Sequence, residues 1–246
     1  MLGQRQVSLL QVISAAAFCP QTPLLVPALA TGAAGELAGL RAACTAAISR
    51  LHAPGRRLVL LGAGESSRSH SPLARGSLAG YGAALEVQLG NTGCGGALEL
   101  PLSLTIGAWL VREALGPRSG AIGFSVGPDG LAGPAAAELL ALAEAEDLAL
   151  LVMGDGSARR GPSAPGYLDP RAVPFDDTVI AALQAGDAAA LAGLDPALGE
   201  AVLAGGVPAC RAAGRLLDGG SYDTETRYVG DPYGVSYVVV SWITRA

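Results

Sequence analysis

Residues 148–157 read LALLVMGDGS, six apolar residues in a row followed by a turn rich in glycine. A continuous apolar run of this length predicts a β-strand that is covered on both faces, as strands of parallel sheets are. Residues 58–62 and 121–126 repeat the pattern. Parallel strands must be joined by crossover segments, which are usually helices, so we expect helices between these runs.

The segment before residue 58 has helical spacing. From residue 35 to 52 its apolar positions recur every three or four residues, at Leu37, Leu40, Cys44, Ile48 and Leu51. This spacing predicts an amphipathic helix. Further helices are predicted at residues 103–115, 134–146, 176–185, 187–194, 196–203 and 207–217, and further strands at residues 7–18, 84–89, 221–229 and 235–242.

Strands alternate with helices along the whole chain. We therefore predict a single α/β domain over residues 1–246, a three-layer α/β/α sandwich around a mixed, largely parallel central sheet. The polar stretch 64–82 is predicted as a long loop. In such sheets ligands bind at the carboxyl ends of the strands, which here are residues 19–23, the loop from Gly62 and residues 154–174.

The composition excludes several classes of function. All 16 positively charged residues are arginine, which leaves no lysine for a Schiff base or a phosphate-binding loop. The formal net charge of −5 argues against nucleic-acid binding. No apolar run reaches the ~18 residues that a membrane span needs, and Gln11 and Ser14 interrupt the N-terminal run that resembles a signal peptide. Four cysteines without a Cys-x-x-Cys pair fit reduced thiols, so we expect a cytoplasmic protein.

Two glycine motifs resemble known sites but lack their context. Gly62-Ala63-Gly64 follows a predicted strand, but Ser67 stands at the third glycine position of a dinucleotide-binding loop. Residues 123–127 read Gly-Phe-Ser-Val-Gly and match the nucleophile turn of α/β-hydrolases, which needs a histidine downstream of the serine. Both histidines of the chain precede it. We therefore interpret Ser125 as a buried serine at the end of a strand.

A combination of short motifs carries a family resemblance. Cys19-Pro20-Gln21-Thr22-Pro23 follows the first strand, and Gly154-Asp155-Gly156-Ser157-Ala158-Arg159-Arg160 follows a late one. Residues 165–167, 175–176 and 186–187 continue the series as Pro-Gly-Tyr, Phe-Asp and Gly-Asp. In this order the motifs resemble the catalytic B subunits of class III extradiol ring-cleavage dioxygenases. That superfamily includes protocatechuate ring-opening enzymes and Memo-like proteins, and the match is greatest to an actinobacterial branch of it.

The resemblance implies a single-domain α/β sandwich that is often dimeric. It also implies non-haem Fe(II) held by two histidines and a carboxylate, with a further histidine as acid and base. The chain departs from that pattern. Gln21 stands where the first iron-binding histidine is expected, and Ala158 stands at the acid/base position. Gly64-Glu65-Ser66 stands where the second iron-binding histidine is expected, and His70 follows several residues later.

These departures decide the predicted function. An amide is a poor ligand for Fe(II), and an alanine cannot transfer a proton. We therefore predict a noncatalytic or divergent small-molecule-binding protein with no cofactor and no assigned catalytic residue. The alternative is an active aromatic ring-cleavage dioxygenase that holds Fe(II) or another divalent metal by substitute ligands, drawn from Cys19, Glu65, His70 and Asp155. A third hypothesis is a structural role in which the protein's own side chains fill the crevice.

The predicted ligand is a small anionic or aromatic molecule. Arg159 and Arg160 would receive its carboxylate or phosphate, or else would neutralise Asp169, Asp176 or Asp177. The predicted binding residues are Gln21, Asp155, Ser157, Arg159, Arg160 and Tyr167, the last either in the crevice wall or as a surface anchor. The resemblance also predicts a homodimer, and we expect neither nucleic acid nor a membrane as partner.

Overall fold

The computed structural model describes residues 13–90, 93 and 95–245. Its strands are β1 (Ile13–Cys19), β2 (Arg57–Ala63), β3 (Arg68–His70), β4 (Arg75–Ser77), β5 (Glu86–Gln88), β6 (Ile122–Val126), β7 (Leu148–Met153), β8 (Tyr222–Gly230) and β9 (Tyr237–Thr244). Its α-helices are α1 (Pro27–Ala30), α2 (Ala38–Leu51), α3 (Leu102–Leu115), α4 (Gly133–Ala145), α5 (Ala172–Ala185), α6 (Ala188–Ala192), α7 (Pro196–Ala201) and α8 (Val207–Leu216).

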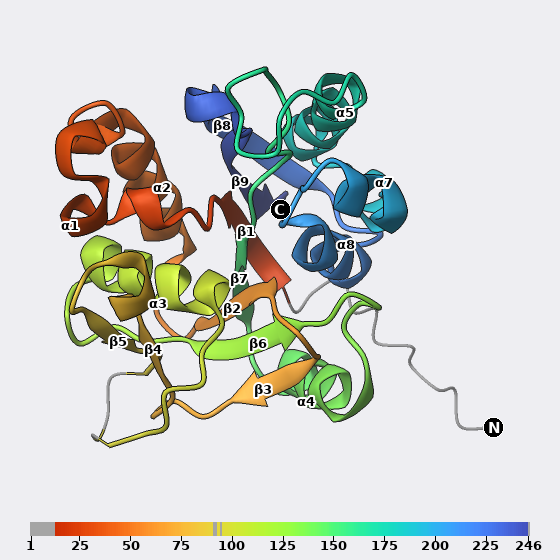
Figure 1. Cartoon of the computed structure of the whole chain (residues 1–246). Helices are drawn as coiled ribbons and strands as arrows, with labels where there is room; N and C mark the ends of the chain where they lie inside the picture. The colour runs from red at the N-terminus through yellow and green to blue at the C-terminus, as the bar shows by residue number, and fades with distance from the viewer. Residues whose placement is uncertain (1–12, 91–92, 94, 246) are drawn as a thin grey trace.

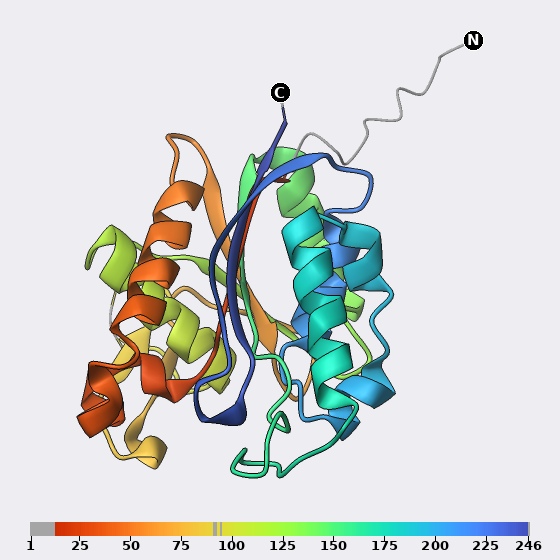
Figure 2. The ribbon, with the colours of Figure 1, turned by 90° about the horizontal axis from the view of Figure 1, so that it is seen from above.

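Seven of these strands form one sheet in the order β3-β6-β2-β7-β1-β9-β8. β6, β2, β7 and β1 run parallel, while β3 and the β8–β9 hairpin join antiparallel at the two sides. Helices cover both faces of the sheet (Figures 1 and 2). The predicted α/β/α sandwich around a largely parallel sheet is therefore confirmed, and the parallel strands bring their carboxyl ends to one edge of the sheet.

An apolar core lies on each side of the sheet. α2 and α3 cover one face, and α4, α5 and α8 cover the other (Figure 2). Side chains along β1 alternate between the two cores, Ala17 facing α2 and Phe18 facing α5, as the pleat of a strand requires. On β9, Trp242 is fully buried, its ring centroid lies 5.0 Å from that of Phe18, and its Nε1 donates to the Leu183 carbonyl at 2.7 Å. Trp242 therefore fastens the C-terminal hairpin to α5.

The prediction of one long loop over residues 64–82 is wrong. β3 pairs with β6 in this stretch and places His70 opposite Gly123, while β4 pairs with β5 in a separate two-stranded sheet. A 3₁₀ turn follows at Ala79–Tyr81. Strands of three residues are too short to show an alternating pattern, and their polar residues hide them further.

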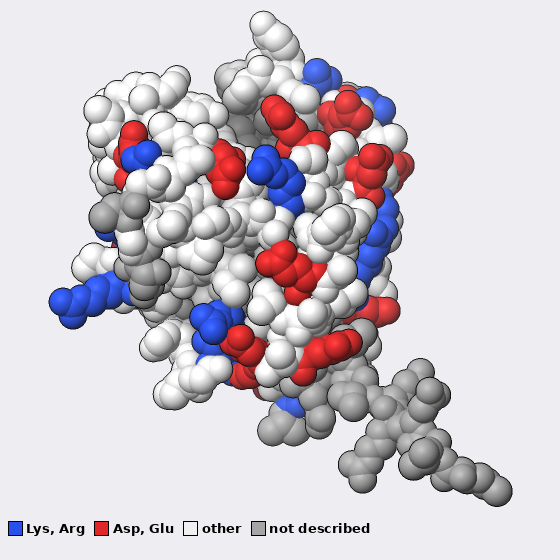
Figure 3. Space-filling model, turned by 90° about the horizontal axis from the view of Figure 1, so that it is seen from below, with Lys and Arg blue, Asp and Glu red and all other residues white. Residues whose placement is uncertain are grey.

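The other predicted helices and strands are present, with ends that differ by a few residues. The predicted helix at 35–52 begins as an α-helix only at Ala38. In the predicted first strand, Ile13–Cys19 is buried as expected, and residues 7–12 lie outside the described residues. Within the described part of the chain, no helix is long and apolar enough to cross a membrane. Acidic and basic side chains are interspersed on the face shown in Figure 3, and no basic patch dominates it.

Candidate functional site

Gln21 and Asp155 meet at the carboxyl ends of β1 and β7. The two strands are neighbours, with Cys19 opposite Met153, and the chain continues from both toward the same side. The amide of Gly154 donates to the Cys19 carbonyl at 2.9 Å, and the amide of Gln21 donates to Asp155 Oδ1 at 2.9 Å. The two residues are 134 positions apart in the chain, and the strand register alone brings them together.

The Asp155 carboxyl has an altered pKa. It keeps some contact with solvent, but protein atoms surround most of it, and this desolvation raises its pKa to about 7. Hydrogen bonds from the backbone of Gln21 and Thr22 oppose the rise. Burial similarly raises the pKa of the neighbouring Tyr237 hydroxyl to about 12. Near neutral pH the Asp155 carboxyl is therefore partly protonated, whereas the Tyr237 hydroxyl stays protonated.

The Gln21 side chain has an unused acceptor. Its Oε1 is buried and has no hydrogen-bond partner among the described residues. A buried carbonyl oxygen without a partner costs free energy, so a donor from a ligand or a water would stabilise it.

Ser157 and Arg160 are held by Asp176, which is 1% exposed. Asp176 accepts hydrogen bonds from the backbone amide and the hydroxyl of Ser157, at 2.8 and 2.5 Å. It also accepts from Arg160 Nη1 at 2.9 Å, while Arg160 Nε donates to Asp231 at 2.9 Å. Arg160 therefore contacts two carboxylates. This fits the interpretation that it neutralises aspartates better than the interpretation that it binds an anionic ligand.

Arg159 also lies beside a carboxylate. Its Nη1 is 3.7 Å from Asp169, and Asp169 is bound more tightly by Arg171, at 2.7 Å. The hydrogen bonds from Arg171 are the main reason that the pKa of Asp169 falls to about 2. Arg159 keeps one buried Nε without a partner among the described residues. Arg160 is thus engaged by carboxylates, whereas Arg159 is only near Asp169, at a distance too long for a hydrogen bond.

Ala158 and Tyr167 contribute little polar chemistry. The Ala158 backbone donates to the Val202 carbonyl and accepts from Gly166, which fixes the turn that follows β7. Tyr167 is 77% exposed and has a left-handed φ of 61°. The structure therefore places Tyr167 on the surface and not in the wall of a crevice.

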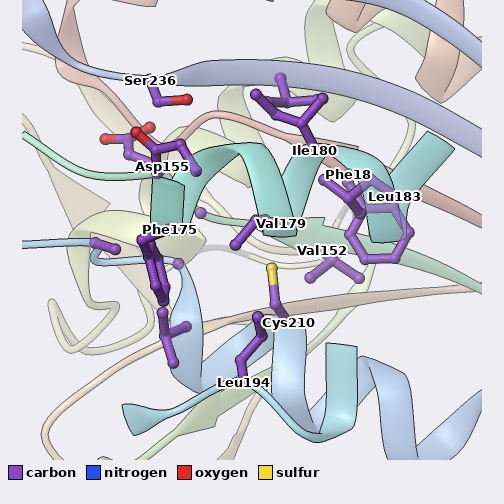
Figure 4. Close-up of a pocket in the computed structure, with 17 residues that line it drawn as sticks. Phe18, Val152, Asp155, Phe175, Val179, Ile180, Leu183, Leu194, Cys210 and Ser236 are labelled. Atoms are coloured by element: carbon purple, nitrogen blue, oxygen red, sulfur yellow. The ribbon is translucent and has the colours of Figure 1, made fainter. Parts of the chain in front are cut away.

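A narrow apolar cavity of about 30 Å³ lies behind Asp155, between the sheet and α5 and α8. Figure 4 shows Asp155 and Ser236 side by side, with Cys210 of α8 across the cavity among apolar side chains. Burial raises the pKa of the Cys210 thiol to about 12, so it stays protonated. The space admits a water molecule or two but not an aromatic ring, for which an engineered cavity of about 150 Å³ is a known example.

A second, polar pocket of about 330 Å³ lies at the carboxyl ends of β2 and β6, and we call it the β2–β6 pocket. Its polar side chains are those of Glu65, Ser66, Arg68, His70, Glu99 and Ser125. His70 Nε2 lies 3.0 Å from Ser125 Oγ, which itself donates its hydrogen to the Ser66 carbonyl at 2.8 Å.

The direction of these hydrogen bonds decides what the His70–Ser125 pair can do. Ser125 has one hydrogen, and since Ser66 receives it, the imidazole must donate from Nε2. A general base needs the opposite arrangement, in which it accepts the hydroxyl proton. Ser125 is also 3% exposed. We therefore interpret Ser125 as a structural serine and not as a nucleophile.

The substitute metal ligands do not converge. Cys19 is buried against Cys44 on the α2 side of the sheet, whereas Asp155 borders the cavity on the α5 side. His70 is on β3, three strands from β7, which is roughly 14 Å at the usual strand spacing. Among the described residues no three His, Cys, Asp or Glu side chains come together as a metal site. The residues present at the ends of β1 and β7, an amide and one carboxyl, do not fit Fe(II).

Three features of the site had no signal in the sequence. The contact of Asp176 with Ser157, the position of Tyr237 beside Thr22 and the pairing of His70 with Ser125 each join residues from different segments of the chain. The Phe-Asp motif at 175–176 drew attention to Asp176 without revealing its partner.

Comparison with known proteins gives only distant structural likeness. No family model and no curated protein sequence matches the chain. A solved structure, that of the uncharacterized protein JW3007 from Escherichia coli K12, superposes with a TM-score of 0.48 at 16% sequence identity. The match covers 93% of this chain and 99% of that chain. This likeness assigns neither a family nor an activity to the chain.

Proposed function

We propose that this chain is a class III extradiol dioxygenase-like protein that binds a small molecule at the ends of β1 and β7 without iron. The observation that carries the proposal is the pairing of Asp155 with Gln21. A carboxyl with a pKa of about 7 accepts from the backbone amide of Gln21, whose side-chain Oε1 has no partner among the described residues. The order of the motifs along the chain supports the family likeness.

The chemistry of the two groups defines the ligand. Asp155 and Gln21 Oε1 are both hydrogen-bond acceptors, so the ligand presents hydroxyl, amide or amine hydrogens. Because carboxylates already engage Arg160 and neighbour Arg159, a neutral aromatic ligand fits better than an anionic one. The adjoining 30 Å³ cavity is too small for the ring itself, which therefore binds on the solvent side of Asp155.

Ring cleavage is not part of the proposal. The family reaction needs a metal held by imidazoles and a histidine for proton transfer, and here Gln21 and Ala158 stand at two of those positions. The alternative, a dioxygenase with substitute ligands, needs Cys19, His70 and Asp155 to meet, and they lie on different faces and strands.

We propose further that the protein works in the cytoplasm as a homodimer, with neither nucleic acid nor a membrane as partner. The free cysteines Cys19, Cys44 and Cys210 fit a reducing compartment, and the net charge of −5 argues against nucleic acid. The dimer rests on the family resemblance alone. Light scattering after gel filtration measures the oligomeric state directly. A monomer would contradict the proposed dimer but not the proposed ligand binding, which is tested separately.

Titration with catechol and with phenol, followed by protein NMR, tests the binding proposal. In the wild type we expect saturable chemical-shift changes at Gln21 and Asp155. Asp155→Ala should bind at least tenfold more weakly, which is about the value of one charge-assisted hydrogen bond. Asp177→Ala, which removes an exposed carboxyl of α5, is the matched control and should bind like the wild type. The proposal fails if anaerobic Fe(II) loading gives stoichiometric iron together with cleavage of catechol.

A further inference from the structure

We propose that the β2–β6 pocket is a second binding site, and that it takes a small organic ammonium ion. Its acceptors would be Nδ1 of His70 and the carboxylate of Glu65. This pocket is separate from the Gln21–Asp155 site, because β2 and β6 lie on the other side of β7 from β1.

The state of the His70 ring is fixed by its neighbours. Ser125 gives its hydrogen to the Ser66 carbonyl, so Nε2 carries the ring hydrogen and Nδ1 carries a lone pair. Desolvation lowers the pKa of His70, so the ring stays neutral at physiological pH. The pocket therefore has a neutral imidazole that accepts a hydrogen bond in one defined direction.

Nδ1 has no partner for that hydrogen bond. His70 is 4% exposed, and its Nδ1 is buried without a partner among the described residues. Buried nitrogen acceptors are nearly always satisfied, and one that is not calls for a ligand, an ion or a water. His70 lines the pocket, so a donor held in the pocket is the candidate partner.

The charges of the pocket favour a cation. Glu65 is exposed and has no ion-pair partner among the described residues. Glu99 contacts Arg68 at 3.5 Å, a long pair between exposed side chains that contributes little. One carboxylate is therefore left without a counter-charge. Since no three metal-binding side chains of the described residues come together, an N–H donor fits better than a divalent metal.

The volume limits the ligand to a small molecule. About 330 Å³ is near the lower end of the range of ligand pockets, roughly 300 to 1,000 Å³. The pocket also lies at the carboxyl ends of parallel strands, where α/β sheets usually bind their ligands. A primary amine with a short carbon chain satisfies the size, the charge and the unpaired acceptor together.

The experiment uses the imidazole signals of the whole protein. The chain has only two histidines, His52 and His70, so their ring nitrogens can be assigned by nitrogen-15 NMR. Propylammonium is the probe, with 1-propanol and propionate as neutral and anionic controls of similar size. We expect propylammonium alone to shift the Nδ1 resonance of His70 saturably, while His52 stays unchanged.

Substitutions separate binding from folding. His70→Gln keeps an N–H near Ser125 but has no acceptor at the place of Nδ1, and it should lower the propylammonium affinity about tenfold or more. Glu65→Gln should weaken binding by a smaller factor, about two- to fivefold, because pairs of exposed charges contribute little. Glu144→Gln, which removes an exposed carboxylate on α4, should leave the affinity unchanged. The proposal is overturned if propylammonium leaves His70 unchanged, if propanol shifts it equally, or if Glu65→Gln binds like the wild type while remaining folded.

Discussion

At the scale of single residues, the environment of a side chain matters more than its type. Gln21 stands where the resemblance predicts a histidine, and its backbone amide binds Asp155, a contact that needs no particular side chain. What changes is the chemistry beyond the backbone. A carboxamide offers one acceptor and one donor group that carry no charge, where imidazole would offer a metal ligand.

Arg160 shows the same dependence on environment, because it binds one buried carboxylate, Asp176, which also accepts from Ser157, and one exposed carboxylate, Asp231. Asp176 is 1% exposed at its side chain and Asp231 is 56% exposed. Replacing Asp176 by alanine leaves the Arg160 charge and the Ser157 amide without their buried partner. We expect a loss of about 3–5 kcal/mol in the free energy of unfolding, measured by urea denaturation.

The matched substitution is Asp231→Ala, which removes the exposed partner of the same guanidinium. We expect it to cost about 0–1 kcal/mol, since exposed ion pairs contribute little. Equal losses for the two variants would show that burial does not set the strength of these pairs.

At the scale of elements, apolar strands were predictable and short polar ones were not. β7 is buried at all of its positions, so its sequence carries the signal of a covered strand without interruption. β3 has the sequence Arg-Ser-His and pairs through its backbone with β6. Pairing through backbone groups does not depend on the polarity of the side chains, so it cannot be predicted from that polarity. The His70–Ser125 contact, which follows from this pairing, was therefore not predicted.

Gly76 in β4 offers a test of the corrected segment. It packs so closely on Thr105 of α3 that a β-carbon at Gly76 would collide with the threonine side chain. We expect Gly76→Ala to lower the free energy of unfolding by about 1–3 kcal/mol, the usual cost of overpacking. Thermal denaturation followed by circular dichroism measures the change.

Gly80→Ala is the control for that substitution. Gly80 lies in the neighbouring 3₁₀ turn, and a β-carbon there meets no other atom within 4 Å. Its melting temperature should match that of the wild type. If Gly76→Ala also leaves the melting temperature unchanged, β4 does not pack against α3 in the way described.

At the scale of the whole molecule, the strand order explains which site residues could be predicted together. The motifs after β1 and β7 were expected to share the crevice, and Gln21 and Asp155 do so because the strands are neighbours. Glu65 and His70 were grouped with them as metal ligands. Local sequence patterns do not predict the order of strands in a sheet. The separation of β3 and β2 from β1 is therefore known only from the structure.

The pH dependence of stability connects this arrangement to a measurement. The pKa of Asp155 is raised from 3.8 to about 7 on folding. Below pH 4 the carboxyl is protonated in both states and has no effect. Between pH 4 and 7 it is ionised only in the unfolded chain, so stability falls as the pH rises, by up to about 4 kcal/mol in total.

Two other groups act in the opposite direction. The lowered pKa of His70 destabilises the fold as the pH falls through 6.5, and the Asp169 pKa of about 2 matters only below pH 4. The contributions of His70 and Asp169 cancel when the free energy of unfolding of Asp155→Asn is compared with that of the wild type, because the two proteins share these groups. We expect the variant to gain stability relative to the wild type steadily from pH 4.5 to 7 in urea denaturation, and the difference to level off above pH 7. Asp177→Asn, at an exposed position, should give a flat difference, and a flat difference for Asp155→Asn would mean that burial does not hold this carboxyl near neutrality.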